Sequence, residues 1–497
     1  MEEVEIMMKR PRNEQEAIVL GSGLGGLVAG TLLSKNNHPV LLLREKGYQP
    51  SYAIKGYRFV PFSNFSEKRL RHSLLKKISQ VMNLPLLAGT QEERERAKII
   101  SGKSKQRAPF QVVLPKSRID IFSQLSLSQN EWKREFPKEA VQIEEFYDEL
   151  DQIQRLSQKA NEKKNSSPFF PLRQRSFLKK YFPFKPFPNE TIDQKLFPFS
   201  REFREFIQLQ LISWGNLYSD RFPISLAAHI LFDEANELNP DFDLEKLEKE
   251  ILNQFLQSGG RIEEIDRVKK VNRVWGKGFT LSFEEDPKVF QSQFLIFNSP
   301  LHRISSLLGK KGKELLKWGS KIKPLYVMIP LFLGIREKVI PVGMKDLLIS
   351  ILDLEKPYDD GNVLFLSLST KGDETRAPEG RRALTVQSLM DVRKWEQTLL
   401  VDYQQGIMKH LYHLFPFLED YIEFVDFQWA SDHVPRWSYS SFLYEATSNF
   451  YWREGMVPLS MSKNIYFVGK ENFPYWGLGG EIFGGLTVAQ QVLKKYS

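Results

Sequence analysis

The sequence predicts an α/β protein that combines a parallel sheet, assembled from both ends and the middle of the chain, with a second domain of mixed sheet and helices. Three observations predict this fold class. A strand–glycine–helix–strand pattern occupies residues 16–46, helix and strands alternate over residues 245–297, and a second strand–glycine–helix pattern occupies residues 464–495. Strands that alternate with helices are typical of parallel sheets.

The opening pattern carries a glycine motif. A short apolar strand at residues 17–20 precedes a helix that extends to about residue 36, and the turn between them consists of Gly21, Ser22, Gly23, Leu24, Gly25 and Gly26. In this context GxGxxG predicts a dinucleotide-binding turn. Gly21 allows the tight turn, Gly23 lets the backbone approach a pyrophosphate, and Gly26 lets the helix pack closely on the sheet. We expect the helix N-terminus to direct its free N–H groups at the phosphates.

Two later segments return the chain to the same sheet. The middle segment is predicted to form a helix and four strands, at residues 245–258, 261–265, 268–274, 279–283 and 290–297. The C-terminal segment is predicted to form a strand, a glycine-rich turn and a helix, at residues 464–469, 477–480 and 481–495. We therefore predict a Rossmann-like domain made from residues 14–75, 245–305 and 460–497.

The remaining residues, 76–244 and 306–459, are predicted to form a substrate-binding domain. Its predicted elements are a hairpin, two helices and three strands of a second sheet, at residues 110–122, 139–158, 394–415, 325–335, 363–369 and 382–387. Because strands and helices are mixed here without regular alternation, we expect a mixed sheet with helices rather than a second parallel sheet.

Composition limits the chemistry and the location of the protein. The 497 residues include no cysteine, which excludes disulfides, thiolate catalysis, Fe–S clusters and cysteine-ligated zinc and agrees with a cytoplasmic location. The first 16 residues contain no apolar stretch typical of a secretory signal. The longest apolar run, residues 324–335, is shorter than the about 20 residues that a membrane-spanning helix needs. We expect no membrane crossing.

Residues 168–188 form a candidate membrane-docking segment. They contain seven aromatic and five basic residues and no acid, and the whole chain has a formal net charge of +9. Aromatic rings together with lysine and arginine suit the surface of an anionic membrane. A proline-rich surface segment whose phenylalanines pack on their own domain is the alternative. A nucleic-acid partner would explain the charge but none of the motifs, so we do not expect one.

These motifs resemble those of FAD-dependent oxidoreductases of the phytoene desaturase and carotenoid isomerase group, within the wider amine-oxidase-like flavoproteins. The matching pieces follow the family's order, at residues 16–46, 55–64, 110–150, 259–271, 364–386 and 464–493. The resemblance implies that FAD is held at Gly21, Gly23, Leu24, Gly26, Glu45, Val268, Gly469, Leu478, Gly479 and Gly480, with Glu481 next in the turn that approaches the flavin pyrimidine edge.

The resemblance also implies a reaction. Hydride would move between a carbon–hydrogen bond and the flavin N5 in the desaturation, saturation or isomerisation of a hydrophobic polyene or lipid-like substrate, as in carotenoid biosynthesis. The 37 phenylalanines could line an apolar tunnel for such a substrate. This group of enzymes does not depend on one invariant base, so no catalytic residue is assigned.

Four positions depart from the family's pattern. Arg44 replaces the acid at the end of the second strand, where a one-residue bulge would be needed to bring Glu45 to the adenosine ribose. Residues 48–52 replace the second glycine pair, Lys470 replaces the acid of the C-terminal motif, and residues 244–250 lack the usual glycines. Two alternatives therefore stay open: a non-catalytic lipid- or partner-binding protein that has lost FAD, and an amine-oxidase-type enzyme with a polar substrate.

Two histidines have a spacing that suits a metal. His410 and His413 lie three residues apart on a predicted helix, but no third ligand has a recognisable spacing. We therefore expect an exposed pair on the helix surface and no metal site.

Overall fold

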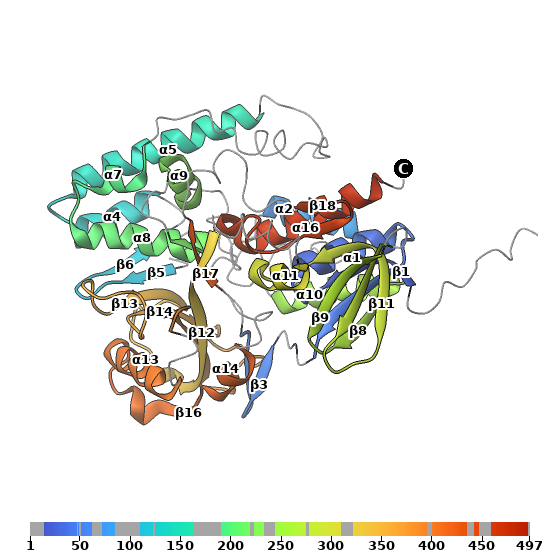
Figure 1. The fold of residues 1–497 in the computed structure, drawn as a ribbon. Coiled ribbons are helices and arrows are strands. Elements are labelled where there is room, and N and C mark those ends of the chain that lie inside the picture. Colours follow the sequence, from blue (N-terminus) through green and yellow to red (C-terminus); the bar gives the residue numbers. More distant parts are fainter. Residues whose placement is uncertain are drawn as a thin grey trace, which may run out of the picture.

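The computed structural model describes residues 14–46, 48, 51–61, 72–84, 110–122, 125–162, 190–218, 223–232, 244–274, 278–309, 322–394, 400–434, 442–446 and 459–495. The candidate docking segment, residues 168–188, lies outside the described residues, so its interpretation stays a prediction. Two large sheets organise the described chain (Figure 1).

The first sheet joins strands from both ends and the middle of the chain. Its order is β18 (Ser460–Ser462), β19 (Ile465–Phe467), β11 (Val289–Phe297), β1 (Glu14–Leu20), β2 (Val40–Glu45) and β8 (Arg261–Ile265). The pairs from β19 through β8 are parallel, whereas β9 (Val268–Val274) and β10 (Gly278–Phe283) extend from β11 as antiparallel strands. The predicted assembly of a Rossmann-like sheet from discontinuous segments is confirmed.

Helices α1 (Leu24–Lys35), α10 (Leu244–Gln257) and α16 (Gly477–Leu493) pack together on this sheet (Figure 1). Glycines permit the close crossing of α1 and α16, because a Cβ at Gly485 would lie 2.2 Å from the carbonyl oxygen of Gly25. Helix α16 begins at Gly477, which has the positive φ of a turn (+51°), so the prediction of a turn at residues 477–480 holds for Gly477 and is wrong for residues 478–480, which are helical. The first turn of α16 packs closely on the residue before η7 (Pro474–Trp476), because a Cβ at Gly480 would lie 2.5 Å from the Phe473 carbonyl oxygen.

The second sheet is mixed, as predicted. Its order is β6 (Arg118–Ile121), β5 (Phe110–Val113), β13 (Leu347–Ile351), β14 (Val363–Leu368), β15 (Arg381–Asp391), β12 (Ile322–Arg336), β17 (Phe442–Ala446) and β7 (Leu217–Tyr218), with β16 (Ile422–Asp426) also paired to β12. The pairs β5–β13 and β7–β17 are parallel and the others are antiparallel. Strands β7, β13, β16 and β17 are absent from the sequence prediction.

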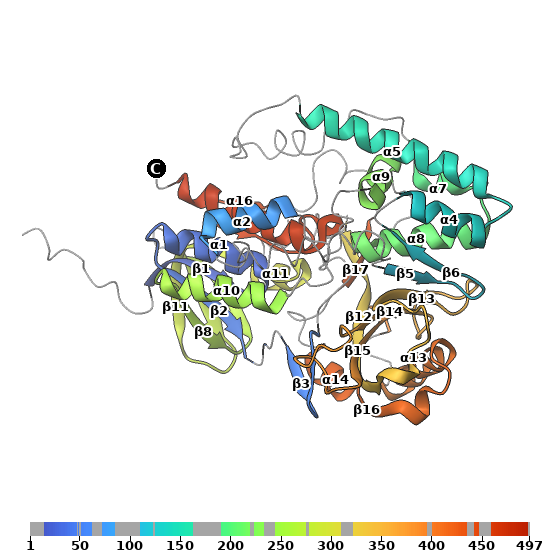
Figure 2. The ribbon, with the colours of Figure 1, turned by 180° about the vertical axis from the view of Figure 1, so that it is seen from behind.

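Helices lie on both sides of this second sheet (Figure 2). One group consists of α4 (Leu125–Glu135), α5 (Ala140–Glu162), α7 (Ile192–Leu196), α8 (Arg201–Gly215) and α9 (Ile224–Phe232). The opposite side carries α13 (Leu400–Leu414) and α14 (Gln428–His433). The small hairpin of β3 (Tyr52–Ile54) and β4 (Tyr57–Phe59) packs on the second sheet, with the rings of Phe59 and Phe332 4.9 Å apart.

The remaining described elements are short or peripheral: α2 (His72–Met82), α11 (Leu301–Leu307), η5 (Glu337–Val339) and η6 (Leu418–Tyr421). Among the helices in the described part of the chain, none combines the length and apolar character that crossing a bilayer requires.

The expectation of an exposed histidine pair on α13 is wrong for His410. Its side chain has no exposed surface. Its Nε2 lies 2.8 Å from the Ser350 hydroxyl, and its Nδ1 lies 2.8 Å from the carbonyl oxygen of Gly361. His410 is therefore buried between α13 and the second sheet and held by two hydrogen bonds, whereas His413 is exposed.

Candidate functional site

The carboxyl ends of β1, β11 and β19 meet at the turn before α1. The Asn298 N–H, directly after β11, donates to the Leu20 oxygen over 2.8 Å, and the Val468 N–H, directly after β19, donates to the Phe297 oxygen over 2.8 Å. Ligands of open parallel sheets bind outside the carboxyl ends of the strands. This edge is the candidate cofactor site.

The backbone of the turn has the geometry that the glycine motif predicts. Gly21 has φ +128°, and a Cβ there would lie 2.0 Å from the Asn298 carbonyl oxygen. A Cβ at Gly26 would lie 2.8 Å from the Asn298 side chain and 2.9 Å from Val19. Glycine is therefore required at the turn and at the contact between α1 and the sheet.

The N-terminus of α1 is already hydrogen-bonded by two side chains of the protein. The Gly25 N–H donates to Glu481 Oε1 over 3.2 Å, and the Gly26 N–H donates to Asn298 Oδ1 over 3.2 Å. The Asn298 amide nitrogen in turn donates to Glu481 Oε1 over 3.1 Å and to the Val468 oxygen over 2.6 Å. We call this pair of side chains the internal cap. Both are buried, at 5% exposure for Glu481 and 7% for Asn298.

The internal cap fills the space that a pyrophosphate needs. A Cβ at Gly23 would lie 2.3 Å from Glu481 Oε1 and 2.4 Å from Asn298 Oδ1. Gly23 is the position at which the backbone of a dinucleotide-binding turn approaches the pyrophosphate. The backbone therefore fits a cofactor phosphate, and the side chains of Glu481 and Asn298 lie in the space that this phosphate would take.

Two buried polar atoms near this edge lack a hydrogen-bond partner among the described residues. They are the Ser22 hydroxyl, in the glycine turn, and Nε of Arg44, at the end of β2. Both atoms can donate to a phosphate oxygen. Unsatisfied buried donors at the carboxyl edge of the sheet fit the binding of an anionic cofactor there.

Arg44 belongs to a small polar cluster that replaces the family's ribose-binding acid. Its guanidinium lies 4.8 Å from the ring centre of Tyr48 and 3.7 Å from a carboxylate oxygen of Glu248 on α10. The Tyr48 hydroxyl donates to Glu248 over 2.9 Å. Burial raises the pKa of Glu248 to about 7, against the opposing effects of Tyr48 and Arg44.

The one-residue bulge that Glu45 would need to reach a ribose is not present between β2 and β8. Strands β2 and β8 pair in an unbroken register, with Arg44 opposite Glu264 and Glu45 opposite Ile265. Glu45 forms an ion pair with Arg303 of α11. The pairing of β2 with β8 continues through both Arg44 and Glu45, which leaves no extra residue for a bulge. The assignment of Glu45 to the cofactor remains a prediction.

The other predicted cofactor residues lie at the same edge or close to it. Val268 is the buried first residue of β9, opposite Phe283. The Gly469 N–H donates to the Asn472 side chain over 2.7 Å. Leu478, Gly479 and Gly480 form the first turn of α16, and Leu24 begins α1. Their contacts with FAD remain predictions.

A second buried acid lies close to the internal cap. Glu471 accepts a hydrogen bond from the Leu301 N–H over 3.1 Å. Burial raises its pKa, and the nearby charge of Glu481 raises it further. Acidic side chains therefore gather at the edge where an anionic cofactor is expected.

An aromatic wall surrounds the start of α16. The rings of Phe473, Trp476 and Phe483 lie 5.3 to 5.6 Å apart, and Tyr475 lies 5.9 Å from Trp476. The Trp476 indole N–H donates to Nε2 of His229, on α9, over 3.4 Å. Sequence reasoning missed His229, because it meets the C-terminal motif only in the folded chain, 247 positions away from Trp476.

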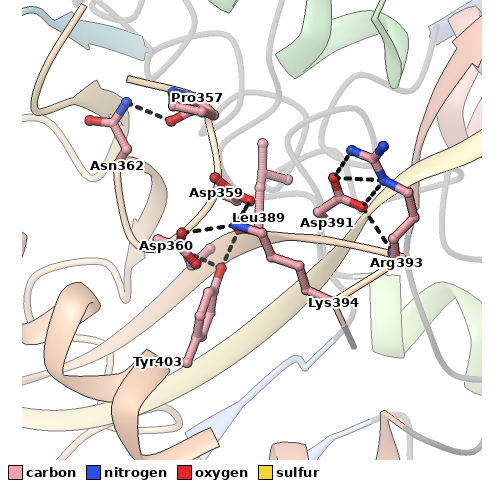
Figure 3. Close-up of polar contacts among 10 residues, drawn as sticks. Pro357, Asp359, Asp360, Asn362, Leu389, Asp391, Arg393, Lys394 and Tyr403 are labelled. Atoms are coloured by element: carbon pink, nitrogen blue, oxygen red, sulfur yellow. Dashed lines mark hydrogen bonds and ion pairs between the residues drawn. The ribbon is translucent and has the colours of Figure 1, made fainter. Parts of the chain in front are cut away.

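Acids at one end of the second sheet are paired with cations of the chain (Figure 3). The Lys394 ammonium lies 2.7 Å from Asp359 and 3.0 Å from Asp360, and Arg393 donates to Asp391 over 2.9 Å. The Arg393 hydrogen bond lowers the pKa of Asp391. Within the described ranges, no group of three or more potential ligands could hold a metal ion.

The fold and the turn define a class: a protein with a dinucleotide-type turn at the edge of a parallel sheet and a separate mixed sheet. The sequence profile of the family "Flavin containing amine oxidoreductase" matches residues 135–493, and the chain therefore belongs to this family. The predicted resemblance is confirmed. The members of this family are flavin-containing oxidoreductases, so the cofactor that belongs to this fold is a flavin.

Individual relatives are distant. Chloroplastic prolycopene isomerase of carrot (Daucus carota) is 23% identical over 419 residues, which cover 79% of this chain and 64% of the carrot protein. The match thus spans less than two thirds of that relative. Among solved structures, putrescine oxidase bound to putrescine has a TM-score of 0.61 at 14% identity, covering 97% of this chain and 99% of its own. Cyclohexylamine oxidase from Brevibacterium oxydans has a TM-score of 0.57 at 11% identity, covering 96% and 99%. These structures share the fold.

Proposed function

We propose that the protein uses FAD to oxidise, reduce or isomerise a hydrophobic polyene or lipid-like substrate. The observation that carries this proposal is the aromatic wall at the start of α16, the element that the family resemblance places beside the flavin. Phe473, Tyr475 and Phe483 are buried and Trp476 is partly buried, which gives the wall a largely apolar character. The similarity to carrot prolycopene isomerase supports the same substrate class.

The residues of the chain would provide position and exclude water. FAD, when bound, supplies the two-electron chemistry. Ser22 and Arg44 would donate hydrogen bonds to its phosphates, and Gly21 and Gly23 would allow their close approach. The rings of the wall would keep water from the substrate, and His229 would fix the plane of the Trp476 indole by accepting its N–H.

A visible spectrum followed by substrate reduction tests the proposal. We expect the purified protein, after incubation with FAD and removal of the free cofactor, to keep flavin absorption bands that are released on denaturation. Under anaerobic conditions a lipophilic polyene, and not putrescine, should change the redox state or the turnover of the bound flavin. Reduction by putrescine alone would instead favour the amine-oxidase alternative. A protein that takes up no FAD would favour the binding-protein alternative.

Gly23→Val should abolish flavin uptake. The new side chain would occupy the space between the turn and the internal cap, where a Cβ alone comes within 2.4 Å of Glu481 and Asn298. Flavin content per protein, measured after denaturation, checks the expectation. Gly30→Ala is the matched control on the same helix, because its Cβ would meet only side-chain carbons, at 3.3 Å or more. Unchanged flavin content in Gly23→Val would contradict the assignment of the turn.

Residues 168–188 are proposed to hold the protein at an anionic membrane surface. Replacing Arg173, Arg175, Lys179 and Lys180 with glutamate should weaken binding to vesicles that contain phosphatidylserine, because each basic residue near such a surface contributes about 1 kcal/mol. Co-sedimentation measures the bound fraction, with pure phosphatidylcholine vesicles as the control. Equal binding of both proteins to the anionic vesicles would rule out the docking proposal.

A further inference from the structure

We propose that the Glu481 carboxylate occupies the phosphate position at the N-terminus of α1 and has to leave this position before FAD binds. The cost of its release then lowers the affinity of the protein for the cofactor. This inference rests on the proposed FAD site. It concerns a side chain of the chain itself, whose place follows from its hydrogen bonds to Gly25 and Asn298.

The hydrogen bonds make Glu481 a direct competitor of a phosphate. A helix N-terminus binds anions because its first N–H groups point outward and carry the positive end of the dipole. At α1 the Gly25 N–H is taken by the Glu481 carboxylate, and the Gly26 N–H is taken by Asn298. A phosphate oxygen would need the same donors and the same space over Gly23, so the carboxylate and the pyrophosphate exclude each other.

The surrounding charges strengthen this competition. Glu471 and Glu248 are buried near Glu481, and its charge contributes to the raised pKa of both. The charges of the cations at the strand ends are balanced by acids: Arg44 pairs through Nη2 with Glu248, which leaves its Nε for a phosphate, and Arg303 pairs with Glu45. An incoming pyrophosphate therefore meets three buried acids, in an environment where charges interact more strongly than in water.

The movement required is confined to side chains, with Glu481 the charged one. The backbone of α16 cannot withdraw from α1 without loss of packing, because Gly485 and Gly25 are in close contact where the helices cross. Rotation of the Glu481 side chain costs the hydrogen bonds from Gly25 and from Asn298 Nδ2. Those bonds stabilise the cofactor-free protein, so removal of the carboxylate should weaken the apoprotein and strengthen FAD binding at the same time.

Two variants test the competition. Glu481→Gln keeps an oxygen acceptor and removes the charge, and Glu481→Ala removes the group. A charge-assisted hydrogen bond contributes more than a neutral one, so we expect the Kd for FAD to fall about tenfold in Glu481→Gln and further in Glu481→Ala. The Tm of both apoproteins should lie below that of the unmodified protein. FAD titration by fluorescence quenching and thermal unfolding without FAD provide the two measurements.

Glu16→Gln is the matched control. Glu16 is also a buried acid of the first sheet, but it lies in β1 five residues before the turn and pairs with His38. If loss of any buried negative charge improved FAD binding, this variant would do so too, and the proposal would be overturned.

The outcomes separate this inference from the proposed function. Tighter FAD binding in the Glu481 variants but not in Glu16→Gln supports it. Equal FAD affinity in the unmodified protein and both Glu481 variants overturns the inference and leaves the FAD site intact. Uptake of FAD by none of these proteins, with all of them folded by circular dichroism, overturns both, because removal of the internal anion then fails to open the site. If Glu481→Ala does not fold, Glu481→Gln decides the outcome alone.

Discussion

Replacing Gly21 with alanine is expected to destabilise the protein by about 3 to 5 kcal/mol, a large part of the about 5 to 15 kcal/mol that keeps a domain folded. The backbone at Gly21 has φ +128°, which side-chain-bearing residues rarely adopt, and the new Cβ would lie 2.0 Å from the Asn298 oxygen. That oxygen cannot retreat easily, because the N–H of the same residue bonds to Leu20. Urea unfolding measures the decrease in unfolding free energy. If the decrease is too large for the protein to stay folded, the variant should give a low yield of soluble protein.

A second glycine separates the two causes of this loss. Gly372 has φ +76°, and a Cβ there would meet no atom within 4 Å. Gly372→Ala should therefore cost only the backbone strain, on the order of 1 kcal/mol. The difference between the variants then combines the close approach of β1 and β11 at the turn with the higher backbone strain at φ +128°. Equal losses in the two variants would show that the turn is not tightly packed.

The sequence predicted those features that depend on residues close to one another along the chain. The turn at Gly21, the helix after it and the strands around residues 261–297 follow from local patterns, and the structure has them. Strand β13 was missed because a five-residue apolar run between loops has no periodicity that distinguishes strand from helix.

The side-chain contacts of the site were not predictable in this way. Asn298 and Glu481 are 183 positions apart and meet only because β11 and α16 converge at the same turn. The position of Asn298 directly after a strand was a usable signal, since carboxyl ends of parallel strands gather at one edge. Nothing in the sequence around Glu481 distinguishes an internal cap from a residue that faces the flavin. The ion pair of Glu45 with Arg303 likewise depends on the packing of α11.

The environment of His410, in contrast, had a visible signal. Tyr403, Ile407 and Leu414 are spaced along α13 as one buried face, and His410 falls on that face, three residues after Ile407. The spacing of His410 and His413 suggested that the two residues act together, whereas the side chain of His410 contacts Ser350 and Gly361. A histidine on an apolar helix face is better predicted as buried and neutral than as exposed.

The unfolding free energy is expected to fall by about 3 kcal/mol between pH 7 and pH 4 through His410 alone. Burial lowers the pKa of His410 to about 4, from an ordinary value of 6.5. As the pH falls through 6.5, His410 binds a proton in the unfolded chain. In the folded chain His410 stays neutral until the pH reaches about 4. Each pKa unit between the two states is worth about 1.4 kcal/mol. The contribution of neutral His410 to the unfolding free energy is therefore fully present above pH 7. It declines as the pH falls from 7 to 4 and changes little below pH 4.

The two hydrogen bonds of His410 explain why its imidazole stays unprotonated in the folded protein. The Gly361 carbonyl can only accept, so Nδ1 carries the hydrogen and Nε2 accepts from the Ser350 hydroxyl. Protonation of Nε2 would reverse the Ser350 bond and bury a charge. Urea unfolding from pH 4 to pH 8 should show this slope in the unmodified protein and in His413→Gln, whose altered residue is exposed, but not in His410→Gln. Parallel curves for the unmodified protein and His410→Gln would exclude the buried imidazole as its source.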